Sequence, residues 1–240
     1  MRYVRFLLPL LALLAVAGHA QEPSYTVHRA TAALTLQSAG EAAWSGAEKT
    51  TWGPKGYSTT FRALWTKDAL WLRFDVEDPS PWNTMTKRDD TIWDEEVVEI
   101  FIDPEAVGEQ YTEYELNPAN VICDLDIRYG NDTFKGDIKW DHAGIDSSVH
   151  KKAASAGFRG GWVGILVLPW KGFDTFDPVK EGRVTVPPKP GDTWKANLYR
   201  IERPGGPKEP RKDGVFAAWS PTGRTTFHYP PAFRPFRFAE

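Results

Sequence analysis

The stretch DDTIWDEEVVEIFIDP, residues 89–104, surrounds one tryptophan with seven carboxylates and ends in a run of strand-forming residues. Successive side chains of a β-strand point to opposite faces, so a strand over 96–103 divides its residues into two sets. The apolar set is Val98, Ile100 and Ile102. The mixed set is Val97, Glu99, Phe101 and Asp103. This division predicts a strand with a hydrophobic core on one face and carboxylates on the other.

The segments around this stretch alternate in the same way. Two runs, 58–65 and 69–79, are separated by Thr66-Lys67-Asp68, which predicts a β-hairpin. One face of the second run is entirely apolar: Leu70, Leu72, Phe74 and Val76. Further strands are expected at 111–118, 120–129, 161–170, 193–203, 215–221 and 227–238, with short strands within 130–160.

Short strands punctuated by glycine and proline, without a long amphipathic helix or an internal repeat, are typical of an all-β domain. We expect a two-sheet antiparallel β-sandwich of the immunoglobulin or jelly-roll type. Residues 57–240 should form the sandwich. Residues 21–56, a weakly patterned helical or loop segment, should pack on it, which predicts one domain from about Tyr25 to the end.

The first twenty residues have the pattern of a signal peptide. Arg2 and Arg5 precede an apolar run over 6–16, and Gly18-His19-Ala20 supplies small residues for cleavage before Gln21. The residue directly after that site is glutamine and not cysteine, so a lipid anchor is not expected, and no other apolar run is long enough to span a membrane. The protein is expected to be exported, either to the periplasm or outside the cell.

The composition excludes some classes of function. Without Arg2 and Arg5, 27 basic residues (29 − 2) remain against 32 acidic ones, a formal charge of −5. An acidic chain without a basic cluster argues against nucleic-acid binding. The single cysteine, Cys123, cannot form an internal disulfide and is expected to be a small buried hydrophobic residue. Eleven tryptophans suit both a β core and surfaces that stack on sugars.

The carboxylates of residues 89–104 allow three interpretations. They could form the solvated face of an antiparallel sheet. They could include the paired carboxylates of a glycoside hydrolase. They could also belong to a binding face on which acids accept hydrogen bonds from hydroxyls, because Glu99 approaches Glu113 or Glu115 if 96–103 and 111–118 pair as a hairpin. Calcium held by the loop acids Asp89, Asp90 and Asp94 could accompany such a face, although these acids lack the spacing of an EF-hand.

Several segments in the same order resemble the family 9 carbohydrate-binding modules and their wider β-sandwich relatives, which include DOMON-like haem- and sugar-binding domains. The matching segments are ALWTKDALWLRFDVEDP, IWDEEVVEIFIDP, YTEYELNP, GWVGILVLPW, GDTWKANLYRIER, AAWSP and FHYPPAFRPFRF. The resemblance covers about residues 57–238 and implies a two-sheet antiparallel sandwich. It also implies a sugar, typically at a chain end, held between two tryptophans that match Trp93 and Trp219. The polar contacts that it implies are Glu99, Glu115 and Asn117.

Two further residues are candidates for the same site. Arg200 is predicted to face outward, where it could bind hydroxyls or pair with the carboxylates, although a buried salt bridge is an open alternative. Trp82, in the loop over 78–95, is a secondary stacking candidate. Five other tryptophans lie within or at the ends of predicted strands and are expected in the core: Trp65, Trp71, Trp162, Trp170 and Trp194.

The ligand expected from the resemblance is a mono-, oligo- or polysaccharide, with polysaccharide-degrading enzymes as possible partners and no required cofactor. One alternative is haem, bound through Met85 and one of four histidines: His28, His142, His150 or His228. A second alternative is a glycoside hydrolase or its accessory subunit. No catalytic residue is assigned, because the chain has no HExxH, P-loop, Ser-His-Asp pattern or Rossmann glycine cluster.

Overall fold

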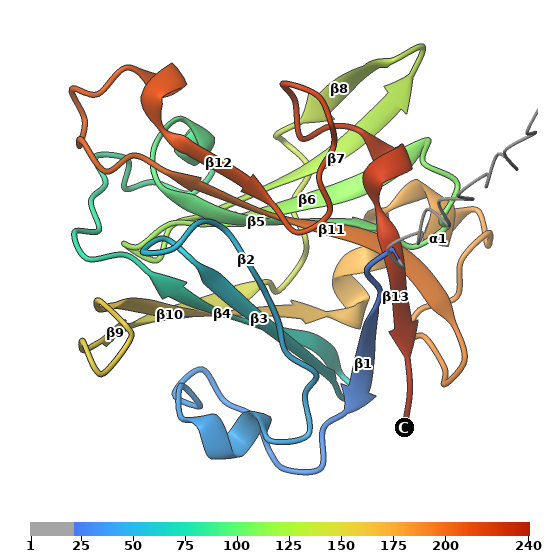
Figure 1. The fold of residues 1–240 in the computed structure, drawn as a ribbon. Helices are drawn as coiled ribbons and strands as arrows, with labels where there is room; N and C mark the ends of the chain where they lie inside the picture. The colour runs from blue at the N-terminus through green and yellow to red at the C-terminus, as the bar shows by residue number, and fades with distance from the viewer. Residues whose placement is uncertain (1–21) are drawn as a thin grey trace, which may run out of the picture.

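The computed structural model describes residues 22–240, so the predicted signal peptide lies outside the described residues. Within that range the chain forms two β-sheets that pack face to face, with short helices in the connections (Figure 1). The predicted all-β sandwich is confirmed. None of the helices in the described range has the length and apolar character needed to cross a membrane.

Sheet A is the upper layer in Figure 1. Its strands, in spatial order, are β8 (Thr133–Asp137), β7 (Ile122–Gly130), β6 (Gln110–Leu116), β5 (Val97–Asp103), β11 (Thr193–Glu202) and β13 (Arg234–Phe238). The short strand β12 (Val215–Ala218) pairs with the second half of β11, beyond the part of β11 that pairs with β13. All of these pairs are antiparallel.

Sheet B is the lower layer. Its strands are β3 (Thr59–Trp65), β4 (Ala69–Glu77), β10 (Gly161–Pro169) and β9 (Asp146–Lys152), with β2 (Thr50–Trp52) paired to β3. The predicted hairpin is β3–β4, whose register places Trp65 opposite Leu70. The short helical elements are η1 (Glu41–Trp44), η2 (Ile92–Asp94), η3 (Trp170–Thr175), α1 (Asp177–Lys180), η4 (Arg211–Asp213) and η5 (Pro230–Ala232).

A strand that the sequence pattern did not indicate joins the two sheets. In β1 (Tyr25–Arg29), the residues Tyr25 to Val27 run parallel to β13, and His28 and Arg29 run parallel to β3. The two layers are therefore hydrogen-bonded to one another along this edge of the sandwich. These two parallel pairs are the exceptions to an otherwise antiparallel arrangement.

Two predicted strands are shorter than expected. The segment 227–238 contributes only β13, because Pro230 and Pro231 begin the helical turn η5 and proline offers no amide to a sheet. The segment 215–221 contributes only β12, which ends at Ala218.

The core between the sheets is built from the faces that the alternation predicts. Val98, Ile100 and Ile102 of β5 pack there, and so does the predicted apolar face of β4. Four of the five tryptophans expected in the core are buried in it: Trp65, Trp162, Trp170 and Trp194. Trp71 is the exception, since it is half-buried on the opposite face of sheet B. Cys123 is buried as predicted, in a second apolar cluster on the outer face of sheet A.

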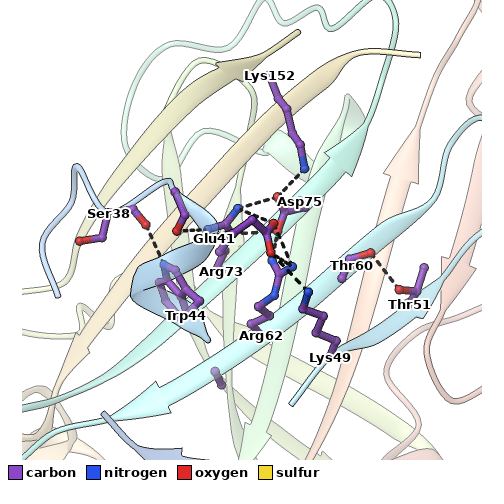
Figure 2. A network of polar contacts seen from close by, with 12 residues as sticks. Ser38, Glu41, Trp44, Lys49, Thr51, Thr60, Arg62, Arg73, Asp75 and Lys152 are labelled. Carbon is purple, nitrogen blue, oxygen red and sulfur yellow. Dashed lines mark hydrogen bonds and ion pairs between the residues drawn. The ribbon is translucent and has the colours of Figure 1, made fainter. Parts of the chain in front are cut away.

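The outer face of sheet B is covered by the segment that contains η1. The carboxylate of Asp75 accepts hydrogen bonds from Arg62 (2.5 Å), Arg73 (2.8 Å) and Lys152 (2.9 Å), and Arg62 also pairs with Glu41 of η1 at 2.8 Å (Figure 2). Arg73 and Asp75 are only 1% and 6% exposed. The polar face of β4 is therefore a buried ionic network, because a segment from earlier in the chain packs over it.

Candidate functional site

The outer face of sheet A carries the main cavity of the described residues, with a volume of about 1150 Å³. Its floor consists of outward-facing side chains of the central strands: Glu99 and Phe101 of β5, Glu113 of β6, Leu125 and Ile127 of β7, and Ile201 of β11. These residues lie on the face opposite to the inter-sheet core because side chains alternate along each strand. The same alternation that builds the core therefore places Glu99 and Glu113 at the floor of the cavity.

Aromatic residues form much of the cavity wall. Phe134 comes from β8 and Phe216 from β12, which stand on opposite sides of the outer face of sheet A (Figure 1). Trp93 comes from η2, and Phe227 and His228 come from the loop over 221–228. The mouth also carries three exposed cationic side chains: Arg211, Lys212 and Arg224. Concave sites with aromatic walls and a few polar groups are typical of small-ligand binding.

Three carboxylates meet at one part of the floor. Glu99 lies directly opposite Glu115 in the β5–β6 register, and Glu113 lies two residues before Glu115 on the same face of β6. One oxygen from each side chain lies within 4.8 Å of the others. The side chains are 2%, 4% and 0% exposed for Glu99, Glu113 and Glu115 respectively. Oε1 of Glu99 and both carboxylate oxygens of Glu115 are buried without a hydrogen-bond partner.

Burial changes the proton affinity of all three acids. It raises the pKa of Glu113 to about 7. Burial, together with the charge of Glu113, raises the pKa of Glu99 well above its ordinary value, although Arg211 opposes this shift. Burial and the charges of Glu113 and Glu99 raise the pKa of Glu115 in the same direction. Without a ligand, the cluster therefore favours protonated carboxylic acids.

His228 connects the cavity wall to the floor. Its ring stacks on Phe134, with ring centroids 3.5 Å apart, and on Phe101 from the floor, at 4.9 Å. Nδ1 of His228 lies 2.8 Å from the hydroxyl of Tyr111, and Nε2 lies 3.8 Å from Oε2 of Glu113. Burial lowers the pKa of His228 to about 4, so the ring is neutral near pH 7 and supplies no counter-charge to Glu113.

The structure brings some of the predicted site residues together. Trp93 and Glu99 both line the cavity. Glu115 lies beside Glu99 in the carboxylate cluster, beneath the lining residues. Asn117 is buried, and its Oδ1 accepts hydrogen bonds from the backbone amides of Ala119 (3.0 Å) and Val121 (2.9 Å). Asn117 therefore holds the turn between β6 and β7.

Trp219 does not face Trp93 across the cavity. Phe216 and Ala218 of β12 line the cavity, whereas Ala217 and Trp219 point the other way and pack against the inter-sheet core. The expected pair of tryptophans is therefore not formed in this structure. The aromatic side chain that β12 contributes to the cavity is Phe216.

Arg200 points toward sheet B and not toward the cavity, so the prediction that it faces outward is wrong. It is fully buried, it forms ion pairs with Glu202 and with Asp78 (3.3 Å), and it lies over the ring of Trp162 at 5.8 Å. The reason is its register: Arg200 lies opposite Val98, which faces the core. The alternative of a buried salt bridge is the arrangement that the structure contains.

Trp82 lies away from the cavity lining. Its Nε1 donates a hydrogen bond to the carbonyl of Arg203 at 2.8 Å, and its backbone amide donates to Glu96 at 2.9 Å. The guanidinium of Arg203 lies 5.5 Å from the centre of the indole ring. In this structure Trp82 anchors the loop over 78–95 to the end of β11.

The three acids suggested for calcium do not share one site. Asp89 groups with Asp124 and Asp141, within 4.8 Å of one another, and not with Asp90 and Asp94. Asp90 accepts hydrogen bonds from backbone amides of its own loop. Asp94 lies 3.7 Å from an arginine of η4. The group around Asp89 is bridged by the guanidinium of the preceding residue, which supplies its positive charge.

The residues suggested for haem binding each contact other groups of the protein. Met85 packs against the outer cluster of sheet A, where its sulfur lies 3.8 Å from the hydroxyl of Thr91. His142 is buried, with one ring nitrogen 2.9 Å from the hydroxyl of Tyr114 and the other 2.9 Å from a backbone carbonyl. The remaining histidines contact other groups: His28 the carbonyl of Glu240, His150 the carbonyl of Leu36, and His228 the hydroxyl of Tyr111. Among the described residues, no hydrogen bond joins Met85 to a histidine.

Apart from Trp93, the sequence did not indicate the aromatic residues of the cavity wall. Phe134 lies in a Gly/Asp/Lys-rich segment, and Phe216 is one of two aromatic residues in VFAAW, with no local signal to show which of them faces outward. The predicted hairpin already indicated Glu113 as a neighbour of Glu99, because Glu113 lies on the same face of its strand as Glu115. The strand boundaries and the pairing of β12 with β11 decide these positions.

Comparisons with known proteins agree with this fold. The sequence profile of the family described as carbohydrate family 9 binding domain-like matches residues 36–163, which is more than half of the chain. The chain therefore belongs to this family. No match was found among curated proteins.

Three solved structures share the sandwich. A suggested carbohydrate-binding protein from Bacteroides uniformis aligns with a TM-score of 0.65 at 20% identity, over 90% of this chain and 98% of the other. A family 9 carbohydrate-binding module from Caldicellulosiruptor kristjanssonii, in complex with cellotriose, aligns with a TM-score of 0.60 at 12% identity, over 90% and 94% of the two chains. A family 9 carbohydrate-binding module from the same organism, in complex with glucose, aligns with a TM-score of 0.58 at 13% identity, over 89% and 95% of the two chains. At these identities the likeness establishes the shared fold.

Proposed function

We propose that the protein binds a carbohydrate in the cavity on the outer face of sheet A. The observation that carries the proposal is the joint presence of Trp93 and Glu99 there, with Oε1 of Glu99 buried and lacking a hydrogen-bond partner. Membership of the family supports it, and so do the cellotriose and glucose complexes of the Caldicellulosiruptor kristjanssonii module.

The aromatic and acidic residues of the cavity match the apolar faces and the hydroxyl-bearing edge of a sugar ring. A pyranose ring presents C–H groups on its faces, which pack on aromatic rings such as Trp93 and Phe216. Its edge presents hydroxyl groups, one of which would donate a hydrogen bond to Oε1 of Glu99. An unpaired buried acceptor costs about 1–3 kcal/mol, so a ligand that satisfies it gains affinity and is oriented at the same time.

The proposal includes a location and a biological role. The pattern of residues 1–20 supports export of the protein to the periplasm or outside the cell. There it would bind mono-, oligo- or polysaccharides and support their breakdown by polysaccharide-degrading enzymes. The protein itself acts in this proposal as a binding protein and performs no catalytic step.

Calorimetric titration of the purified protein with glucose and cello-oligosaccharides tests the proposal. Trp93→Ala should weaken binding by about 10-fold or more, because stacking on an aromatic ring contributes on the order of 1 kcal/mol beyond buried area. Trp71→Ala is the matched control, since Trp71 is also half-buried but lies on the outer face of sheet B. The control should bind sugar as the unaltered protein does.

Equal binding by the Trp93→Ala variant and the unaltered protein would show that this cavity is not the binding site. If no glycan in a broad screen bound, the proposal of carbohydrate binding would be wrong. Release of reducing sugar from a polysaccharide, stopped by Glu99→Gln, would show that the protein is a glycoside hydrolase.

A further inference from the structure

The carboxylate cluster contains more acidic side chains than the binding of neutral hydroxyls requires. The proposed sugar site uses Glu99 as an acceptor, whereas Glu113 and Glu115 have no part in it. All three side chains are at least nine-tenths buried, and one oxygen of each lies within 4.8 Å of the others. Grouping three acids in a buried place is unfavourable unless protons or a cation compensate them.

No cation among residues 22–240 contacts the three carboxylates directly, and the charge of Arg211 acts on Glu99 only from a distance. No lysine or arginine in that range forms an ion pair with any of the three glutamates, and the nearby ring of His228 is neutral near pH 7. Two of the arginines at the mouth of the cavity are already paired, Arg211 with Asp94 and Arg224 with Asp132.

A second observation indicates that the missing cation comes with a ligand. Oε1 of Glu99 is buried and lacks a hydrogen-bond partner, and the side chain of Glu99 forms part of the cavity floor that a ligand would contact. Both oxygens of Glu115, directly behind it, are also unpartnered. The aromatic rings of Trp93 and Phe216 on the wall add faces that attract positive charge.

The spacing of the oxygens suits an ammonium group. A protonated primary amine has three N–H donors arranged tetrahedrally, each reaching a carboxylate oxygen at about 2.8 Å. Three acceptors at that distance lie about 4.6 Å apart, and the three glutamate oxygens lie within 4.8 Å of one another, so one ammonium can span the cluster.

We propose that the sugar bound in this cavity carries a free amino group, as in a hexosamine without its acetyl group, and that Glu99, Glu113 and Glu115 together bind its ammonium. This inference rests on the proposed function, since it names the class of sugar that the same cavity selects. An N-acetylated sugar lacks the charge, and a neutral hexose places one hydroxyl where the ammonium offers three donors.

Calorimetry with three matched ligands tests the inference: glucosamine, glucose and N-acetylglucosamine, each also as a short β-linked oligomer, at about pH 6 so that the amine is protonated. Glucosamine or its oligomer should bind at least about 10-fold more tightly than the glucose counterpart. Equal or tighter binding of the glucose ligand would overturn the inference and leave the proposed function intact. Absence of binding by all the ligands would overturn both.

Measuring the preference for the amino sugar over glucose in variants of the protein tests the role of the carboxylate cluster. Glu115→Gln removes one charge while keeping the shape of the side chain, so it should reduce the ratio of glucosamine affinity to glucose affinity by about 10-fold. Glu181→Gln removes an exposed charge at a remote position and should leave this ratio unchanged. An unchanged ratio in Glu115→Gln would overturn the inference, as would tight binding of CaCl₂ alone that Glu115→Gln abolishes.

Discussion

At the scale of single residues, Glu113 shows how burial gives an ordinary side chain an unusual protonation behaviour. Its carboxylate lies beside those of Glu99 and Glu115 on the outer face of sheet A, with Nε2 of His228 3.8 Å away. Because burial raises the pKa of Glu113 from 4.5 to about 7, the folded protein holds this proton more tightly than the unfolded chain does. Its contribution to stability is therefore fully present below about pH 4.5 and is lost as the pH rises to about 7.

We expect this loss to appear as a pH-dependent difference in stability between the unaltered protein and the Glu113→Gln variant. The free energy of unfolding of the unaltered protein should fall relative to that of Glu113→Gln between about pH 4.5 and pH 7, because glutamine cannot ionise. Above about pH 8 the two curves should run parallel. Urea unfolding at a series of pH values measures both, and contributions from titrating groups outside the carboxylate cluster largely cancel in the difference. Parallel curves between pH 4.5 and 7 would contradict the raised pKa.

At the scale of one element, β12 decides which aromatic ring reaches the cavity. Phe216 and Trp219 lie three residues apart, so an extended chain places them on opposite faces. Phe216 is 41% exposed and lines the cavity, whereas Trp219 is 9% exposed and packs in the core. The pairing of Phe216 with Ile201 of β11 sets this choice.

Substitution of these two residues should separate binding from stability. Trp219→Ala should lower the free energy of unfolding by about 3–5 kcal/mol, as expected for a large aromatic side chain removed from a core. Phe216→Ala should change it by less than about 1 kcal/mol while weakening sugar binding. Chemical unfolding and calorimetric titration of both variants provide the two measurements. A stable Trp219→Ala variant that has lost sugar binding would show that Trp219 contacts the ligand.

At the scale of the whole molecule, each sheet uses its outer face differently. The outer face of sheet A forms the floor of an open cavity. The outer face of sheet B is covered by the segment around η1, through the apolar contacts of Trp44 and the ionic network centred on Asp75 (Figure 2). Burial alone would raise the pKa of Asp75, but hydrogen bonds from Arg73 and Lys152 keep it below its ordinary value.

Removal of this central acid should destabilise the protein strongly. Asp75→Ala leaves the buried cations of Arg62 and Arg73 without their main partner, which should cost about 3–5 kcal/mol in free energy of unfolding. Asp68→Ala is the control, because the Lys67–Asp68 pair is exposed and should contribute less than about 1 kcal/mol. Denaturant unfolding compares the two variants, and equal stabilities would show that the network does not hold the segment in place.

The sequence was sufficient for much of the fold and for a smaller part of the candidate site. The hairpin β3–β4, the inner face of β5 and four core tryptophans follow from alternation within a few residues. Trp93 and Glu99 were found because they lie in the stretch that carries the family resemblance. Arg200 was misplaced because its direction depends on the register between β11 and β5.

The sequence by itself determined that this chain is all-β, because a period of two residues is a local property of each strand. Its resemblance to the family 9 modules, carried by several segments in order, indicated the sandwich. The tertiary structure decided the rest. It placed Glu99, Glu113 and Glu115 together, since residues on separate strands meet only when the register is set. It also chose Phe216 over Trp219 for the cavity and buried the polar face of β4, because pairing and coverage by distant segments are long-range events that no single stretch encodes.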